Sequence, residues 1–149
     1  MQKLNFPSYP FRLRSSGHRS EIFDPVRKRF VALTPEEWVR QHLIAFLHTE
    51  KKISLQLMAC EKGLLVNRIP RRFDLLVFNA SGKPSVIAEC KAPSVPLNDS
   101  VFYQALQYNL ALKVDYLLVT NGLQHFAAKV DYETGTMNFL VSIPDAGML

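Results

Sequence analysis

Apolar residues recur with helical spacing in two segments of the chain. In residues 34–51, Thr34 can cap a helix, Pro35 suits its first turn, and apolar side chains then fall on one stripe. Residues 99–113 repeat this spacing. The pattern therefore predicts two amphipathic helices, one in the first third of the chain and one in the last.

The remaining apolar runs have the length and composition of strands. An Asp-Pro turn divides residues 21–33 into two short strands, and Lys62 and Gly63 suggest a turn within residues 53–69. Two strongly apolar runs flank "NASGK" and predict a hairpin. The expected later strands are a buried strand at 115–122 and a pair of strands within 125–141.

This order of elements predicts a mixed α/β fold, in which helices flank a central β-sheet. A chain of 149 residues has the size of one ordinary domain. We expect that domain to span residues 21–149, preceded by an N-terminal arm over residues 1–20.

Composition narrows the class of protein. Hydrophobic residues make up 48% of the chain and charged residues 21%, as in soluble globular proteins. No apolar run approaches the ~20 residues that span a bilayer, and the N-terminus has no secretory signal pattern. Cys60 and Cys90 both lie in apolar stretches, which favours a packing role over a disulfide or zinc site. We expect a cytoplasmic protein that does not bind membranes.

The net charge of +5 comes entirely from residues 1–29, which carry seven of the 18 basic residues and two of the 13 acidic ones. Aromatic residues are interleaved with these charges. Such a segment could follow a phosphate backbone and stack on bases, or it could pack its aromatic rings on the domain. Both interpretations remain open. The aromatic residues concerned are Phe6, Tyr9, Phe11 and Phe23.

Two charges stand near the end of a strand whose other residues are apolar. Because side chains alternate along a strand, Glu89 and Lys91 share one face. If residues 79–84 form the turn, Phe78 pairs with Ser85. Counting back along the antiparallel strands then places Leu76 opposite Ile87, and Asp74 opposite Glu89.

Directly opposed carboxylates repel each other, and a divalent cation would relieve that repulsion. Mg²⁺ takes oxygen ligands and commonly uses one or two carboxylates with waters, which leaves room for a phosphate oxygen. Lys91, one step further along the face, could counter charge on a scissile phosphate. An ion pair of Lys91 with Glu89 or Asp74 is the competing interpretation.

Several short motifs occur together in one order: "TPEEWVRQ", "NRIPRRFDLLVF", "IAECKAP", "QALQYN" and "VTNG". Over residues 21–143 this order resembles the PD-(D/E)XK nuclease superfamily, and within it the N-terminal nuclease domain of type I restriction enzyme R subunits. The resemblance implies a restriction-endonuclease-like fold. It also implies cleavage of DNA that depends on Mg²⁺, for which Mn²⁺ can substitute.

The resemblance also assigns roles. Asp74 and Glu89 correspond to the metal-binding carboxylates, Lys91 to the catalytic lysine, and the backbone carbonyl of Cys90 to a further ligand. Gln104 and Tyr108 match a Gln-x-x-x-Tyr motif of related nucleases and share one helical face. They could orient Lys91 or touch the backbone of DNA, or form an ordinary polar helix edge.

Glu37 corresponds to a helical acid that supplements the metal site in this superfamily, with Glu36 a weaker choice. Glu37 also fits a capping box with Thr34. The basic residues expected to contact phosphates are Arg27, Lys28, Arg29, Arg71 and Arg72.

Two departures from the family pattern matter. Phe73 stands where the superfamily's name-giving proline would be. The chain also has no room for the helicase motor that follows this domain in type I R subunits. We therefore expect a small nuclease that cleaves DNA. It would act as a free-standing protein, as a homodimer, or together with a separate motor subunit. A non-catalytic nucleic-acid-binding or assembly domain and an RNA-processing enzyme of the same architecture are the alternatives.

Overall fold

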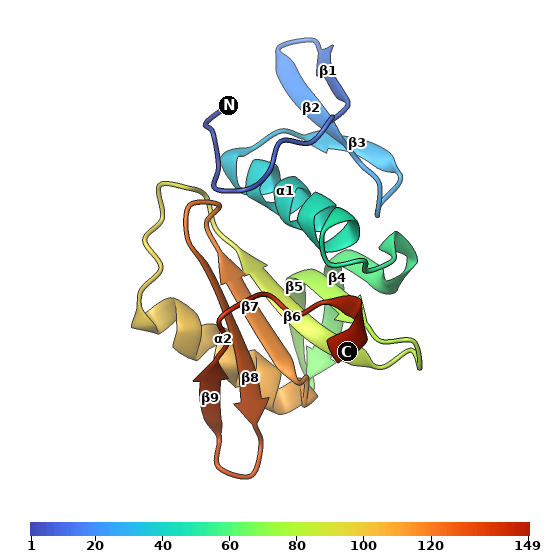
Figure 1. Cartoon of the computed structure of the whole chain (residues 1–149). Helices are drawn as coiled ribbons and strands as arrows, with labels where there is room; N and C mark the ends of the chain where they lie inside the picture. Colours follow the sequence, from blue (N-terminus) through green and yellow to red (C-terminus); the bar gives the residue numbers. More distant parts are fainter.

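The first third of the chain forms a small antiparallel sheet and a helix (Figure 1). The computed structural model describes all residues, 1–149. The sheet has the order β1-β2-β3, and the predicted Asp-Pro turn joins its second and third strands. Its strands and the helix that follows are β1 (Leu13–Ser16), β2 (Arg19–Asp24), β3 (Arg29–Ala32) and α1 (Pro35–Thr49).

The rest of the chain builds a six-stranded sheet with the order β4-β5-β6-β7-β8-β9. All neighbouring strands are antiparallel except β6 and β7, which are parallel and joined through helix α2. The elements are β4 (Met58–Val66), β5 (Ile69–Phe78), β6 (Pro84–Cys90), α2 (Asp99–Leu112), β7 (Tyr116–Thr120), β8 (His125–Asp131) and β9 (Thr136–Phe139), with short 3-10 helices at Leu55–Leu57 and Ala146–Met148.

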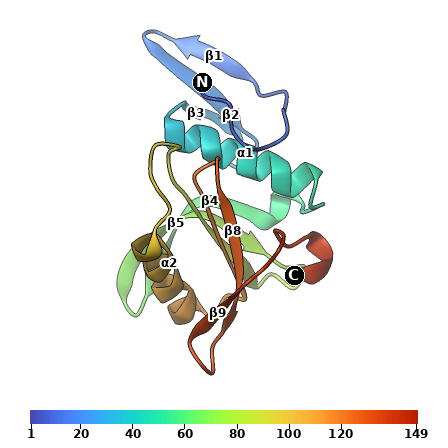
Figure 2. The ribbon, with the colours of Figure 1, turned by 60° about the vertical axis from the view of Figure 1, so that its left-hand side comes forward.

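Helices cover both faces of this larger sheet. On one face, α1 buries Val39 and Leu43 against Leu75 and Ala88 of the central strands. On the other face, residues of α2 pack on the strands beneath them, as Leu106 does in the cluster that includes Leu117. The two ribbon views show α1 between the small and the large sheet (Figures 1 and 2). The predicted mixed sheet flanked by helices is confirmed.

Both helices begin and end as their sequences indicate. The Thr34 side-chain oxygen accepts a hydrogen bond from the Glu37 amide at 3.0 Å, and Pro35 occupies the first helical position of α1. The Asn98 side chain caps α2 by accepting from the Val101 amide at 3.3 Å. Lys113, with φ of 53°, ends α2 in the left-handed region. Neither helix is long and apolar enough to cross a membrane.

One predicted turn is wrong. The strand β4 continues through Lys62 and Gly63, which pair with Phe73 and Arg72 of β5. The chain instead reverses at Asn67 and Arg68, whose φ values are 51° and 64°. A two-residue turn with both φ positive matches the twist of a hairpin, and Asn tolerates it well. Arg at the second position hides the usual Asn-Gly signal.

The N-terminal segment is packed on the domain. Leu4 is 5% exposed and belongs to the main core cluster, and the Asn5 amide donates to the Gly122 carbonyl at 2.7 Å. The Phe6 ring lies 5.6 Å from that of Phe46, between ring centroids. Phe11 and Trp38 are similarly close, at 5.2 Å. Aromatic packing, one of the two interpretations of the arm, is therefore present.

The basic residues of the small sheet are held differently. Arg12 lies over Phe23, with its guanidinium carbon 4.5 Å from the ring centroid, and Arg14 lies 4.0 Å over Phe30. The predicted arm of residues 1–20 thus includes β1 and the first residues of β2. Cation–π contacts place these arginines over aromatic rings, and Arg14 is also paired with Glu21 at 2.5 Å.

Candidate active site

The hairpin of β5 and β6 brings Asp74 beside Glu89. Leu76 pairs with Ile87 and Leu75 with Ala88, so the register continues to Asp74 opposite Glu89. The predicted register is confirmed at Leu76 and Ile87. The predicted pairing of Phe78 with Ser85 is wrong, because a β-bulge after Val77 shifts Phe78 to Pro84.

The Asp74 carboxylate is held by donors on two sides. Its Oδ2 accepts the Cys90 backbone amide at 2.8 Å, and its Oδ1 accepts Arg40 Nη2 of α1 at 3.3 Å. The side chain is 19% exposed. Glu61, its expected neighbour across β4, has φ of 49° and is absent from the strand pairing. Asp74 therefore sits at an irregular point of the sheet with a fixed orientation.

The surroundings of Glu89 disfavour the ionised form of its carboxyl group. Burial, followed by the charge of Asp74 and a hydrogen bond to its carboxyl, raises the pKa of Glu89 from 4.5 to about 8, although Lys91 opposes this shift. Near neutral pH Glu89 therefore holds a proton. A carboxyl whose pKa is raised by burial and by a neighbouring carboxylate marks a candidate functional site.

Lys91 follows β6 directly. Its backbone amide donates to the Thr120 carbonyl at 2.8 Å, which ties the residue to the end of β7. Its side chain takes part in no ion pair, so the competing interpretation of a salt bridge with Glu89 or Asp74 is not observed. The charge of Lys91 nevertheless lowers the pKa of Glu89 and of Glu36, which places it among these acids.

Glu37 is occupied by other partners. Its carboxylate accepts hydrogen bonds from Arg27 at 2.5 Å, Arg40 at 2.6 Å and Gln41 at 2.9 Å. The Thr34 amide donates to the Ala32 carbonyl instead of to Glu37, so the reciprocal half of the capping box is missing. The geometry therefore disfavours both predicted roles of the Glu37 side chain.

Glu36 is the helical acid nearer to the hairpin. Burial and the charge of Asp74 raise the pKa of Glu36, while Arg40 and Lys91 lower it. Its Oε1 is paired with Arg40 at 3.2 Å. No group of three or more His, Cys, Asp or Glu side chains is arranged to hold a metal ion. The carboxylates available at this point of the fold are therefore Asp74 and Glu89.

Neither Gln104 nor Tyr108 forms a hydrogen bond with Lys91. Gln104 is exposed on α2 and has no hydrogen bond to the hairpin. The Tyr108 ring packs edge-on against Phe73, the residue before Asp74, with centroids 5.8 Å apart. The Arg71 guanidinium carbon lies over the Tyr108 ring, 5.4 Å from its centroid. The structure thus places Tyr108 in the packing behind Asp74 and Gln104 on the surface.

The residues predicted to contact phosphates fall into two groups, those without an ion pair and those that form one. Lys28, Arg29 and Arg71 are exposed. Arg27 does not fit the prediction of a phosphate contact, because its side chain is only 13% exposed and pairs with Asp24 and Glu37. Arg72 is 70% exposed, but it donates to Glu61 at 2.6 Å. Arg27 is thus a structural ion-pair partner.

A family model described as "Type I restriction enzyme R protein N terminus" matches residues 35–144. The chain belongs to this family. A similar solved structure is a fragment assigned as an HsdR subunit of a type I restriction enzyme from Vibrio vulnificus YJ016, with TM-score 0.54 and 19% identity. The match covers 77% of this chain and 24% of that chain, so this chain spans about a quarter of its length. No curated protein matches the chain significantly.

The matched region of this restriction-enzyme family contains both helices, the whole six-stranded sheet and the acidic hairpin. The likeness to the HsdR fragment concerns the fold and is consistent with a restriction-endonuclease-like architecture. The small sheet and the N-terminal segment, residues 1–34, lie outside the matched region. They form an addition that packs on α1 from its far side (Figure 2).

A hollow lies beside the small sheet, and none of Asp74, Glu89 and Lys91 lines it. It has a volume of about 410 Å³ and lies between β3, the start of α1 and β4. Arg29 lines its rim, and Glu36, Arg40 and Glu61 line the part nearest Asp74. The charged side chains of its lining are three arginines and three glutamates: Arg27, Arg29, Arg40, Glu36, Glu37 and Glu61.

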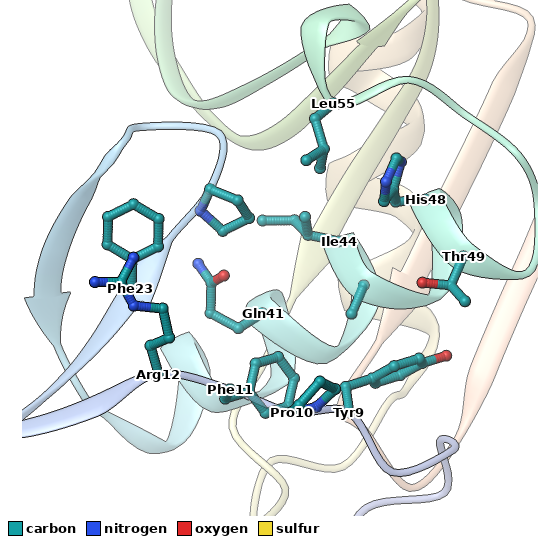
Figure 3. A pocket seen from close by; sticks show the side chains of 12 residues that line it. Tyr9, Pro10, Phe11, Arg12, Phe23, Gln41, Ile44, His48, Thr49 and Leu55 are labelled. Atoms are coloured by element: carbon teal, nitrogen blue, oxygen red, sulfur yellow. The ribbon is translucent and has the colours of Figure 1, made fainter.

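A second pocket lies away from the carboxylates. It has a volume of about 260 Å³ between the N-terminal segment, β2 and α1, and none of Asp74, Glu89 and Lys91 lines it. Gln41 projects its amide into this pocket from α1, between aromatic and apolar walls (Figure 3). The same amide donates to Glu37, so the pocket borders the ion-pair network without reaching the acidic hairpin.

Arg40 is the residue of the site that the motifs did not identify. Arg40 follows Glu36 by four residues and Glu37 by three, and this spacing predicts ion pairs on one face of a helix. Its contact with Asp74 joins residues 34 positions apart and follows only from the packing of α1 on the sheet.

Proposed function

We propose that this chain is a nuclease domain that hydrolyses phosphodiester bonds of DNA with the help of Mg²⁺ or Mn²⁺. The observation that carries the proposal is the half-buried pair of Asp74 and Glu89. Burial, followed by the charge of Asp74, raises the pKa of Glu89 to about 8, which makes the pair a candidate site for a proton or a cation. Membership of the type I restriction R-protein family supports the same reading.

The donor set fits a hard divalent cation. Two carboxylates and waters are a common ligand set for Mg²⁺, and the Cys90 carbonyl beside them could add a third protein oxygen. When bound, the metal would polarise the scissile phosphate and lower the pKa of a coordinated water.

The protein's own residues hold the Asp74 carboxylate in a fixed orientation and position Lys91. The Cys90 amide and Arg40 fix the orientation of the Asp74 carboxylate, which lies beside Glu89. Lys91, anchored through its amide to β7 and free of an ion pair, is available to counter negative charge that develops on the phosphate. Tyr108 supports this arrangement indirectly, through its packing on Phe73.

The proposed substrate is DNA that approaches over the basic rim. Lys28, Arg29 and Arg71 are exposed and unpaired, as phosphate contacts require. Membership of the type I restriction R-protein family also supports the proposal that the domain works with other type I restriction subunits, such as a motor, or as a homodimer.

A cleavage assay tests this function. Purified protein is incubated with linear duplex, circular duplex and single-stranded DNA over a Mg²⁺ titration. We expect cleavage that requires divalent metal and that is lost in Asp74→Asn, because the amide lacks the charge that binds the cation. Asp115→Asn, at an exposed position, serves as the matched control. Cleavage in EDTA, or full activity of Asp74→Asn, would contradict the proposal.

A second candidate function is a non-catalytic DNA-binding or assembly domain. The observation in its favour is the absence of a group of three acidic or other ligand side chains arranged for a metal. It predicts DNA binding without cleavage at any Mg²⁺ or Mn²⁺ concentration. It also predicts that Asp74→Asn binds DNA as tightly as the wild type, with or without metal.

The basic rim makes a separate prediction. Neutralising Lys28 and Arg29 together should lower the slope of log K for DNA against log salt by about 0.9 for each lost phosphate contact. The measurement is a fluorescence-anisotropy titration at several salt concentrations. Replacing exposed Lys62 and Lys129 gives a double variant of equal charge change. Equal slopes in the two double variants would show that the rim does not bind DNA.

A further inference from the structure

We infer that Arg40 limits the acidic hairpin to one divalent cation, by taking the place that a second cation would occupy beside Asp74. The inference rests on the proposed function, since it presupposes that Asp74 and Glu89 bind metal. It concerns a side chain that belongs to neither the carboxylate pair nor the lysine motif.

Four carboxylates surround the Arg40 guanidinium. Its Nη1 lies 2.6 Å from Glu37 and 3.3 Å from Glu61, and its Nη2 lies 3.2 Å from Glu36 and 3.3 Å from Asp74. The side chain is 2% exposed. A guanidinium does not lose its proton in proteins, so this buried position carries a permanent positive charge.

These contacts use the acids that a second metal ion would need. Glu36 and Glu61 are the carboxylates next to Asp74 on the α1 side, and both face Arg40. Glu61 also pairs with Arg72 at 2.6 Å, and Glu37 with Arg27 at 2.5 Å. A divalent cation entering between Asp74 and Glu36 would have to displace the guanidinium and would meet its charge at close range.

On the hairpin, Asp74 lies beside a carboxylate without a cationic partner. Glu89 forms no ion pair, whereas Arg40 pairs with Asp74 from α1. A cation between these two carboxylates removes their repulsion and keeps the Arg40 contact intact. The geometry thus provides a place for one cation in the pair and fills the adjoining place with protein.

The test counts bound Mn²⁺ by electron paramagnetic resonance at fixed ionic strength, with the whole chain and no DNA. We expect one ion per wild-type chain and none in Asp74→Asn/Glu89→Gln. Two ions per wild-type chain would overturn the inference and leave the proposed metal site standing. No bound ion would overturn the proposed metal site itself, and the inference with it.

Variants of Arg40 identify the cause. Arg40→Gln should bind two Mn²⁺ ions, because Asp74 and Glu36 then lack their cation, whereas Arg40→Lys should still bind one. If Arg40→Gln does not fold, as judged by circular dichroism, Arg40→Gln/Glu37→Gln keeps the wild-type net charge and leaves the same two carboxylates without an ion pair. A folded variant without the guanidinium that still binds one ion would overturn the role of Arg40.

Discussion

Replacing Lys91 with alanine is expected to slow DNA cleavage by about 100- to 1,000-fold, the usual cost of removing a donor that stabilises developing charge. The dissociation constant for DNA should change by less than about threefold, because a group that acts mainly in the transition state contributes little to ground-state binding. Lys91 makes no ion pair, so its loss should leave the fold intact. Single-turnover cleavage and anisotropy binding measure the two quantities separately.

Lys83→Ala provides the matched control, because Lys83 lies exposed in the turn of the same hairpin. It should cleave like the wild type. If Lys91→Ala cleaves at the wild-type rate, Lys91 has no catalytic role. If it loses DNA binding in proportion to cleavage, Lys91 acts as a phosphate contact alone.

The free energy of unfolding of the metal-free protein is expected to fall as pH rises between about 4.5 and 8. The folded-state pKa of Glu89 is raised from 4.5 to about 8, so over this range the folded state binds a proton that the unfolded state has released. Stability therefore decreases with pH, since the slope follows the protons bound by the unfolded state minus those bound by the folded state. Below about pH 4.5 the folded and the unfolded state both carry this proton, so Glu89 no longer makes the stability depend on pH.

Glu89→Gln removes this titration, so the free energy of unfolding should fall less steeply with pH. At pH 8 the variant should melt several degrees above the wild type, because each kcal/mol of stability raises the melting temperature by roughly 2–4 °C. Glu36, whose pKa is also raised, should leave a smaller residual slope. Differential scanning calorimetry in EDTA measures both, with exposed Glu133→Gln as control. A variant with the same pH dependence as the wild type would show that Glu89 ionises normally.

The same experiment with metal should reverse the ranking. A cation at ten times its dissociation constant adds about 1.4 kcal/mol to a folded state that alone binds it. The wild type should gain accordingly at pH 8, and Glu89→Gln should gain much less. An equal gain in both proteins would place the cation elsewhere.

The acidic hairpin could be derived from the sequence because two local rules act together. The alternation of side chains and the length of the turn between Phe78 and Pro84 determine which residues face each other. The bulge after Val77 changed one pair at the turn, and the pairs further along kept their predicted partners. A local pattern was therefore sufficient to bring Asp74 to Glu89.

The ion-pair network could not be derived in the same way. Charge counts make Arg27 and Arg29 equivalent, yet the turn after β2 directs Arg27 inward to Asp24 and leaves Arg29 exposed. Likewise, the helix spacing relates Arg40 to Glu36 and Glu37 but says nothing of Asp74. Which charged residue is buried depends on how α1 packs between two sheets, and no local pattern encodes that packing.

The position of Leu4 has a consequence for the order of folding. Leu4 packs in the main core cluster, and Asn5 bonds to residues near the far end of the chain. Its amide donates to the Gly122 carbonyl, and its carbonyl oxygen lies in hydrogen-bond contact with the His125 side chain. Contacts between such distant residues form late, because closing so long a loop costs chain entropy before any contact compensates it. During synthesis the first residues must therefore wait, without their partners, until the strands β7 and β8 have left the ribosome.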